Sequence, residues 1–204
     1  MNPEIMPPEE KRYIFSALLL AEATVLVIAI IWGLIRHIHW WNNIRLTSLT
    51  LAGLFMGPVL CGVGILVYNF LKRFSFTYAR YMIEELLRPL FTGLPIFFAL
   101  GLAIISGICE ESFFRGILQQ ETGIWFSNII FGLLHTGSRK LWLGGLWAGL
   151  VGVLLGYIYA VTGDLGLVIL IHAGNNFIAI IYLGKPGPAD KKGNQASTKN
   201  SVLL

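Results

Sequence analysis

The stretch LPIFFALGLAIISGICEESFFRGIL, residues 94–118, joins a long apolar run to three charged side chains. These are Glu110, Glu111 and Arg115, and they stand where a lipid-embedded helix would otherwise be uncharged. A charged side chain near the centre of a bilayer costs roughly 2.5 to 3.5 kcal/mol on insertion scales. Three such residues so close together indicate a specific purpose, either structural or chemical.

The whole chain has the composition of a membrane protein. Of its 204 residues, 55% are hydrophobic and only 13% are charged, about half the charged share of an average soluble domain. Several runs approach or exceed the 18 to 20 apolar residues that a bilayer about 30 Å thick requires. We predict six transmembrane helices, at residues 13–35, 49–71, 94–120, 123–136, 141–161 and 165–183.

Two further segments complete the expected organisation. Residues 71–93, LKRFSFTYARYMIEELLRPLFTG, interleave charged with aromatic and aliphatic side chains, which indicates an amphipathic helix at the membrane interface. From residue 184 onward, Pro, Gly, Lys and Ser replace the apolar residues, which predicts a disordered tail over 184–204. The fold class we expect is therefore all-α: a polytopic membrane helical bundle of about six transmembrane helices and one interfacial amphipathic helix.

The basic residues predict how the chain is oriented. Most of the 15 Lys and Arg residues fall on the side of the N-terminus, whereas the opposite side holds only Arg36 and Arg45. The positive-inside rule then places both termini in the cytoplasm. We expect a multi-pass protein of the cell's inner membrane. The net charge of +4 reflects this asymmetry and gives no indication of nucleic-acid binding.

Polar residues also occur in two later spans, as His135 in FGLLH and as His172 and Asn176 in HAGNN. If the third and fourth spans form a hairpin, Glu110 and His135 both lie roughly 18 Å from the outer surface, at 1.5 Å per residue. His172 and Asn176 are at i and i+4, so they share one helix face. We therefore expect Glu110, His135, His172 and Asn176 to converge near mid-membrane.

Glu111 and Arg115 have the same i, i+4 spacing, with the acid on the N-terminal side, which favours an ion pair. Glu110 is turned about 100° away from Glu111 on the helix. Arg115 would then neutralise Glu111 and leave Glu110 free to act. A pair of this kind also has a purely structural interpretation, since it can fix helix register. Glu22, in the first span, has no predicted partner.

Three motifs follow one another on separate apolar helices: EESFFR, FGLLH and HAGNN, which are EExxxR, FxxxH and HxxxN. In this order they resemble the CPBP family of intramembrane proteases, also called the Abi family, which includes the type II CAAX prenyl endopeptidases. The resemblance covers roughly residues 95–183. It implies hydrolysis of a peptide bond within the membrane, with Glu111 and Arg115 as the supporting pair.

The resemblance also implies individual roles. Glu110 and His135 would hold and deprotonate a water, and His172 with Asn176 would bind the developing oxyanion. These roles are chemically reasonable, because a positioned carboxylate can serve as a general base. An amide and an imidazole aimed at one point can stabilise a tetrahedral oxyanion.

On this basis the chain divides into three parts. Residues 1–92 hold two transmembrane helices and the interfacial helix, 93–183 form a CPBP-like catalytic helical core, and 184–204 form a cytoplasmic tail. In the core, the 141–161 span has glycines on one face that allow close helix contact, and these are Gly145, Gly149, Gly152 and Gly156.

Alternatives remain open at this point. We expect no cofactor, but Glu110, His135 and His172 could equally supply three zinc ligands, although no HExxH motif is present. The expected partners are a membrane peptide or protein substrate and the lipid bilayer, with no nucleic acid, and a homo-oligomer is a further option. The rival functions are a non-catalytic membrane scaffold or bacteriocin-immunity-type protein, and a proton-coupled transporter. Against the transporter, the chain shows no inverted repeat.

Overall fold

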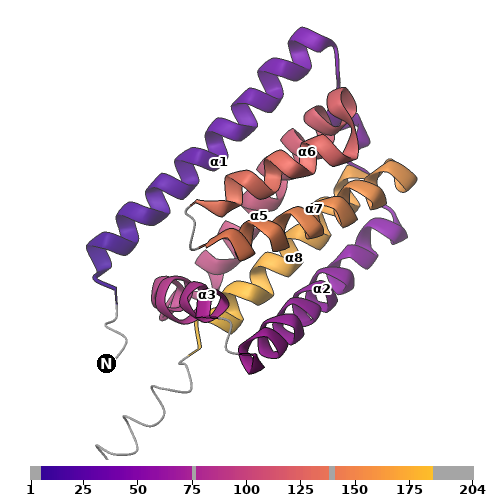
Figure 1. The fold of residues 1–204 in the computed structure, drawn as a ribbon. Coiled ribbons are helices and arrows are strands. Elements are labelled where there is room, and N and C mark those ends of the chain that lie inside the picture. The colour runs from indigo at the N-terminus through magenta and orange to yellow at the C-terminus, as the bar shows by residue number, and fades with distance from the viewer. Residues whose placement is uncertain (1–5, 75–76, 138–140, 186–204) are drawn as a thin grey trace, which may run out of the picture.

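The computed structural model describes residues 6–74, 77–137 and 141–185. Within these ranges the chain is helical and contains no strand. The long helices are α1 (Pro8–Arg36), α2 (Ser48–Arg73), α5 (Ile96–Phe113), α6 (Gln119–Thr136), α7 (Trp142–Thr162) and α8 (Leu165–Leu183). Figure 1 shows them running along one common direction. The expected polytopic helical membrane bundle is confirmed.

The third and fourth predicted spans form one helical stretch that folds back on itself. By length and composition, five helices in the described part of the chain could cross a membrane, and one of them is the stretch Ile96–Thr136. Gly123 interrupts this stretch with φ 82° and ψ 171°, a conformation that glycine adopts without steric cost. The chain reverses there, so α5 and the main part of α6 are separate spans. A π-helical turn, η3 (Phe114–Leu118), continues α5 up to the start of α6.

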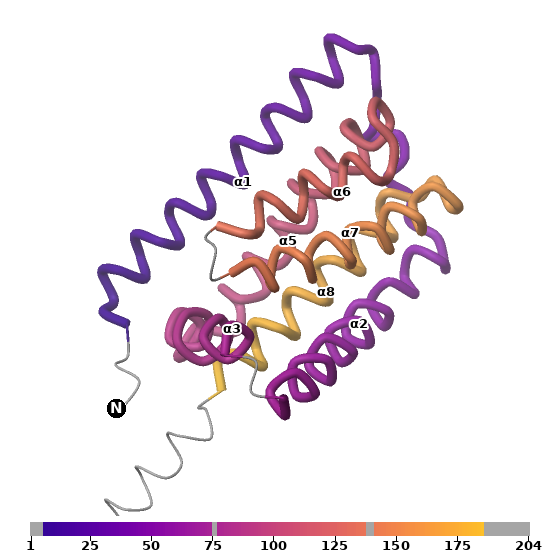
Figure 2. Tube along the Cα trace, in the orientation of Figure 1, coloured from indigo at the N-terminus to yellow at the C-terminus, as the bar shows by residue number. Residues whose placement is uncertain are grey.

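Helix α8 is the central element of the bundle. It packs against α2 on one side and α5 on another, while α6 packs on α7 and α1 packs on α5. Figure 2 shows α1 and α2 on opposite sides of the molecule. The main apolar core surrounds the first half of α8, where Leu165, Leu167 and Val168 are almost completely buried. The helix that contributes two of the expected site residues is thus the most enclosed span.

Close helix contacts depend on glycine at two crossings. At the α6–α7 crossing, a Cβ added at Gly132 would lie 2.8 Å from the Gly145 carbonyl oxygen, and one added at Gly156 would lie 2.7 Å from Gln119 Oε1. The expected glycine face of α7 therefore packs against α6 of the same chain. At the α2–α8 crossing, a Cβ at Gly57 would lie 2.5 Å from the Ile171 carbonyl oxygen.

Replacing Gly57 by Ala is expected to destabilise the bundle. The new methyl group would meet the backbone of α8, which can move only with the whole helix, and overpacking of this kind costs about 1 to 3 kcal/mol. Gly62→Ala on the same helix is the matched control, because nothing lies within 4 Å of its added Cβ. Thermal unfolding in detergent micelles should show a lower melting temperature for Gly57→Ala alone. Equal melting temperatures would contradict the described packing of α2 on α8.

A helical segment lies between α2 and α5, where the amphipathic helix was expected. It consists of α3 (Thr77–Arg80), the π-helical η2 (Tyr81–Leu87) and α4 (Arg88–Phe91). Figure 1 shows α3 nearly end-on, so this segment crosses the direction of the long helices. The predicted tail begins at 184; only Gly184 and Lys185 of it are described, and 186–204 lie outside the described residues.

Arg88 links this helical segment to the C-terminal end of α8 by hydrogen bonds. Its guanidinium group donates to the carbonyl oxygens of Tyr182 and Leu183 at 3.5 and 3.4 Å, and to Glu84 Oε2 at 2.8 Å. A cation is favourable at a helix C-terminus. Burial alone would raise the pKa of Glu84, but hydrogen bonds from Arg88 and Tyr68 outweigh it and lower that pKa below its ordinary value.

Candidate active site

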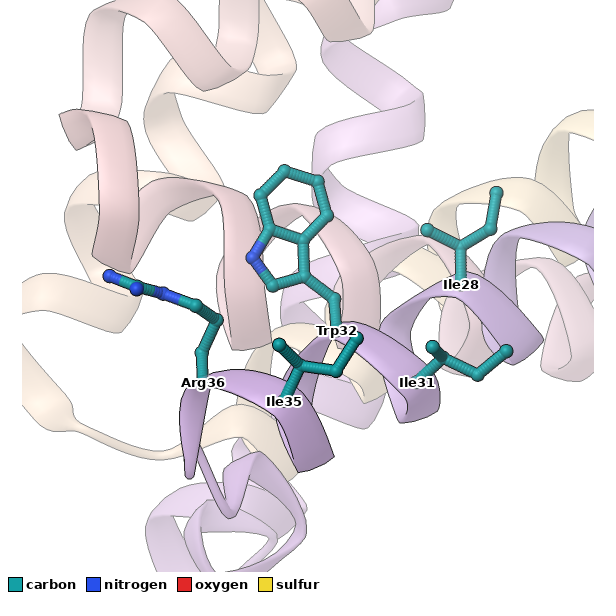
Figure 3. Close-up of a pocket in the computed structure, with 5 residues that line it drawn as sticks. All are labelled: Ile28, Ile31, Trp32, Ile35 and Arg36. Atoms are coloured by element: carbon teal, nitrogen blue, oxygen red, sulfur yellow. The ribbon is translucent and has the colours of Figure 1, made fainter.

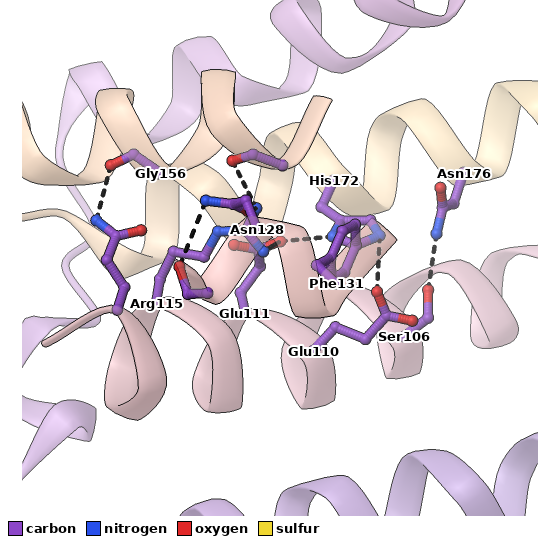
Figure 4. Close-up of polar contacts among 12 residues, drawn as sticks. Ser106, Glu110, Glu111, Arg115, Asn128, Phe131, Gly156, His172 and Asn176 are labelled. Atoms are coloured by element: carbon purple, nitrogen blue, oxygen red, sulfur yellow. Dashed lines mark hydrogen bonds and ion pairs between the residues drawn. The ribbon is translucent and has the colours of Figure 1, made fainter. Parts of the chain in front are cut away.

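One carboxylate and two imidazoles meet inside the bundle. Glu110 Oε2 on α5 lies 3.8 Å from His135 Nε2 on α6 and 3.7 Å from His172 Nε2 on α8. Figure 4 shows the Glu110 carboxyl group below the His172 ring. The Glu110 and His172 side chains are 13% and 8% exposed, whereas that of His135 is 39% exposed. The group is therefore enclosed on the α8 side and accessible at His135.

The partner of each Nδ1 atom indicates the protonation of the two rings. His135 Nδ1 lies 2.8 Å from the Phe131 carbonyl oxygen, which can only accept, so this nitrogen carries a proton. The Nε2 atom of a neutral His135 is then a free acceptor facing Glu110. His172 Nδ1 lies 2.6 Å from Glu111 Oε1, so a carboxylate faces each of its nitrogens. His172 can accordingly hold a proton on both and act as a donor.

A fully buried ion pair contacts His172 on the Nδ1 side of its ring. Arg115 donates to Glu111 Oε1 at 3.0 Å, and neither side chain is exposed. Arg115 also donates to Asn128 Oδ1 at 3.2 Å and to the Gly152 carbonyl oxygen at 2.8 Å, as Figure 4 shows for Asn128. The pair expected from the i, i+4 spacing is thus present. Asn128 and Gly152, however, were not expected as partners.

Asn176 lies one turn beyond His172 and reaches back to α5. Its Nδ2 donates to Ser106 Oγ at 2.9 Å, and its Oδ1 accepts from Asn175 Nδ2 at 3.1 Å. Ser106 stands one turn before Glu110, so two successive turns of α5 and α8 face each other (Figure 4). An amide nitrogen carries two hydrogens, so Ser106 can hold the Asn176 amide while one N–H remains available to a ligand.

The four expected catalytic residues are therefore brought into one neighbourhood, but two of their neighbours were missed. Ser106 and Asn128 are polar residues in otherwise apolar helices, and this sequence feature marks them as candidates for the site. Both bond to residues of the site, Ser106 to Asn176 and Asn128 to Arg115. Ser106 and Asn128 could have been identified by searching each span for polar residues at the same depth as a motif residue on the neighbouring helix.

A recess on the surface of α1 lies apart from the four expected catalytic residues. An open apolar recess of about 330 Å³ on α1 is lined by Ile28, Ile31, Trp32, Ile35 and Arg36 (Figure 3). None of the four expected catalytic residues lines it.

In the described part of the chain, no three His, Cys, Asp or Glu side chains form a group that could hold a metal ion.

The fold and the site together define a multi-pass helical membrane protein with a buried carboxylate, imidazole and amide cluster. Residues 92–178 match the family model described as Rce1-like, type II CAAX prenyl endopeptidase Rce1-like. This match confirms, over the matched segment, the predicted resemblance to CPBP proteins. The matched segment contains every expected site residue and excludes α1 and α2.

Two curated relatives match parts of the chain. The uncharacterized protein YpbD of Bacillus subtilis (strain 168) is 34% identical over 71 residues, which cover 35% of this chain and 38% of the relative. The uncharacterized protein YyaK of the same strain is 30% identical over 98 residues, covering 42% of this chain and 33% of the relative. The chain thus aligns with only 38% and 33% of the length of these two relatives. No solved structure matches the chain.

Proposed function

We propose that this protein is an intramembrane endopeptidase that hydrolyses a peptide bond of a membrane-associated peptide or protein. The observation that carries the proposal is the approach of two imidazole Nε2 atoms to one carboxylate oxygen, Glu110 Oε2, at 3.7 and 3.8 Å. Catalytic hydrogen bonds are often long in the absence of substrate and tighten in the complex. The match of residues 92–178 to the Rce1-like family model supports the same reaction class.

In the proposed reaction, Glu110 and His135 hold one water between them. The water oxygen attacks the carbonyl carbon of the scissile bond while its proton passes to the Glu110 carboxylate. A C–O bond forms and the carbonyl oxygen becomes an oxyanion. The C–N bond then breaks as the proton moves from Glu110 to the leaving nitrogen, which gives a carboxylic acid and an amine.

The oxyanion is assigned to the donors on α8. The doubly protonated ring of His172 and the second N–H of Asn176 would donate to it, and such donors stabilise a developing charge most strongly where water is excluded. Glu111 fixes the His172 ring through the 2.6 Å bond at Nδ1. Arg115 in turn balances the charge of Glu111. The supporting pair would thus act on the oxyanion through His172.

Orientation, substrate and partners are proposals of the same kind. The chain would lie in the cell's inner membrane with both termini in the cytoplasm, as the Lys and Arg distribution predicts. Its substrate would be a membrane peptide or protein, and it would bind no nucleic acid. No step of the proposed reaction passes through a metal. Zinc analysis of the purified protein, with and without chelator treatment, tests the alternative in which Glu110, His135 and His172 bind zinc.

The proposal is tested by comparing membrane proteomes. Cells would carry the intact protein, its Glu110→Gln variant or the control Glu121→Gln, which alters only an exposed pair with Arg36. We expect a membrane peptide that is cut with the intact and control proteins and stays uncut with Glu110→Gln. Identical peptides in all three cell lines would contradict the proposal. A cellular phenotype that persists in cells carrying the Glu110→Gln variant would instead favour a non-catalytic membrane scaffold or bacteriocin-immunity-type protein.

A further inference from the structure

Glu22 is an acidic residue in the middle of α1, in the part of the chain that the family match does not cover. Helix α1 packs beside α5 with the two helices running in the same direction. Phe15 contacts Phe98 with ring centroids 5.4 Å apart, and Trp32 contacts Phe113 at 6.3 Å. Glu22 and Glu110 both lie between these two aromatic contacts. The first span therefore places a second carboxyl group beside the candidate site.

The two carboxyl groups touch each other. The Glu22 and Glu110 carboxyl groups lie within hydrogen-bonding reach of each other, and Glu22 also lies within electrostatic reach of His172. Oε2 of Glu22 and Oε2 of Glu110 are buried, and neither has a hydrogen-bond partner among the other described residues. Burying an unsatisfied polar atom in a low-dielectric setting is costly. Two carboxylates cannot bond to each other unless one of them carries a proton.

We propose that Glu22 is a positioning residue for Glu110: the two carboxyl groups share one proton in a hydrogen bond that joins them. A hydrogen bond between a carboxylic acid and a carboxylate is short and strong because the acceptor is charged. It holds the Glu110 side chain in one orientation between the two imidazoles. It also leaves the pair with a single negative charge. The catalytic consequence rests on the proposed function, whereas the hydrogen bond itself does not.

A double-mutant cycle on thermal unfolding in detergent tests the hydrogen bond without any substrate. The variants are Glu22→Leu, Glu110→Leu and the double variant. Because each single substitution removes the same bond, the double variant should melt about 2 to 4 °C higher than the sum of the two single shifts predicts. Additive shifts would overturn the inference, and so would a deviation of the opposite sign, which indicates repulsion between the two groups.

Thr24 provides the matched control on the same helix. Its hydroxyl group donates to the Leu20 carbonyl oxygen of α1 itself at 2.8 Å. A cycle between Thr24→Leu and Glu110→Leu should therefore be additive. If this control cycle deviates as much as the Glu22 cycle, the deviation comes from the shared helix contact and the inference fails.

The positioning role is tested on the peptide found in the proteome comparison. Glu22→Gln keeps an N–H donor for Glu110 and should retain cleavage, whereas Glu22→Leu should lower kcat by roughly 10-fold to 100-fold with little change in KM. Equal rates for the two variants would overturn the positioning role. If no peptide is cut even by the intact protein, the proposed function fails, and the thermal cycle still decides whether the hydrogen bond exists.

Discussion

Replacing Arg115 by Leu is expected to lower the free energy of unfolding by about 3 to 5 kcal/mol, the usual cost of removing one partner of a buried ion pair. Arg115 and Glu111 are both completely buried, so the remaining carboxylate would lose its guanidinium partner and keep only the His172 ring in the protein interior. Asn128 and the Gly152 carbonyl oxygen would lose a donor as well. Denaturant titration in detergent, followed by circular dichroism, measures the change.

The exposed pair between Arg36 and Glu121 serves as the control for Arg115. Its N–O distance is also 3.0 Å, but the Arg36 side chain is 58% exposed. An exposed ion pair contributes about 0 to 1 kcal/mol, so Arg36→Leu should change stability little. Similar losses for Arg36→Leu and Arg115→Leu would contradict the described burial. Removing both charges, in Glu111→Gln with Arg115→Leu, should cost less than Arg115→Leu alone, because no carboxylate is left without its guanidinium partner.

Local helix geometry made part of this site predictable. The i, i+4 spacing of Glu111 and Arg115 places them on one face in any α-helix, so the pair follows from the sequence alone. The same spacing joins His172 with Asn176. The polar residues of three apolar spans were also expected to face one another inside the bundle, because lipid offers them no hydrogen bonds. The convergence around Glu110 could therefore be expected before any coordinates.

Contacts between helices that are distant in sequence were not predictable in the same way. Asn128 and Gly152 bond to Arg115 only because α6 and α7 cross at close-packed glycines, and a single sequence does not reveal which helix faces meet. The π-helical turn over Phe114–Leu118 also places Arg115 in a segment where the helical phase departs from 3.6 residues per turn. Glu22 had no predicted partner because the packing of α1 on α5 leaves no periodic signal.

Asn176→Ala is expected to lower kcat for the proposed peptide cleavage by about 10²-fold to 10³-fold, the usual loss when one oxyanion donor is removed. Since the oxyanion exists only in the transition state, KM should change little. Asn176→Asp should lose at least as much, because a carboxylate would face the developing negative charge. Steady-state kinetics on the cleaved peptide, with the protein in detergent or liposomes, gives both constants.

Asn175 supplies the matched control, since it is the same residue type one position earlier on α8. Its side chain donates to Asn176 Oδ1 and makes no hydrogen bond to Glu110, His135 or His172, so Asn175→Ala should reduce kcat far less. Ser106→Ala should fall between the two, because Ser106 Oγ holds the Asn176 amide at 2.9 Å without reaching the oxyanion itself. A rise in KM at unchanged kcat for Asn176→Ala would instead make Asn176 a substrate-binding residue. The oxyanion role would then rest on His172 alone, held by Glu111 and Arg115.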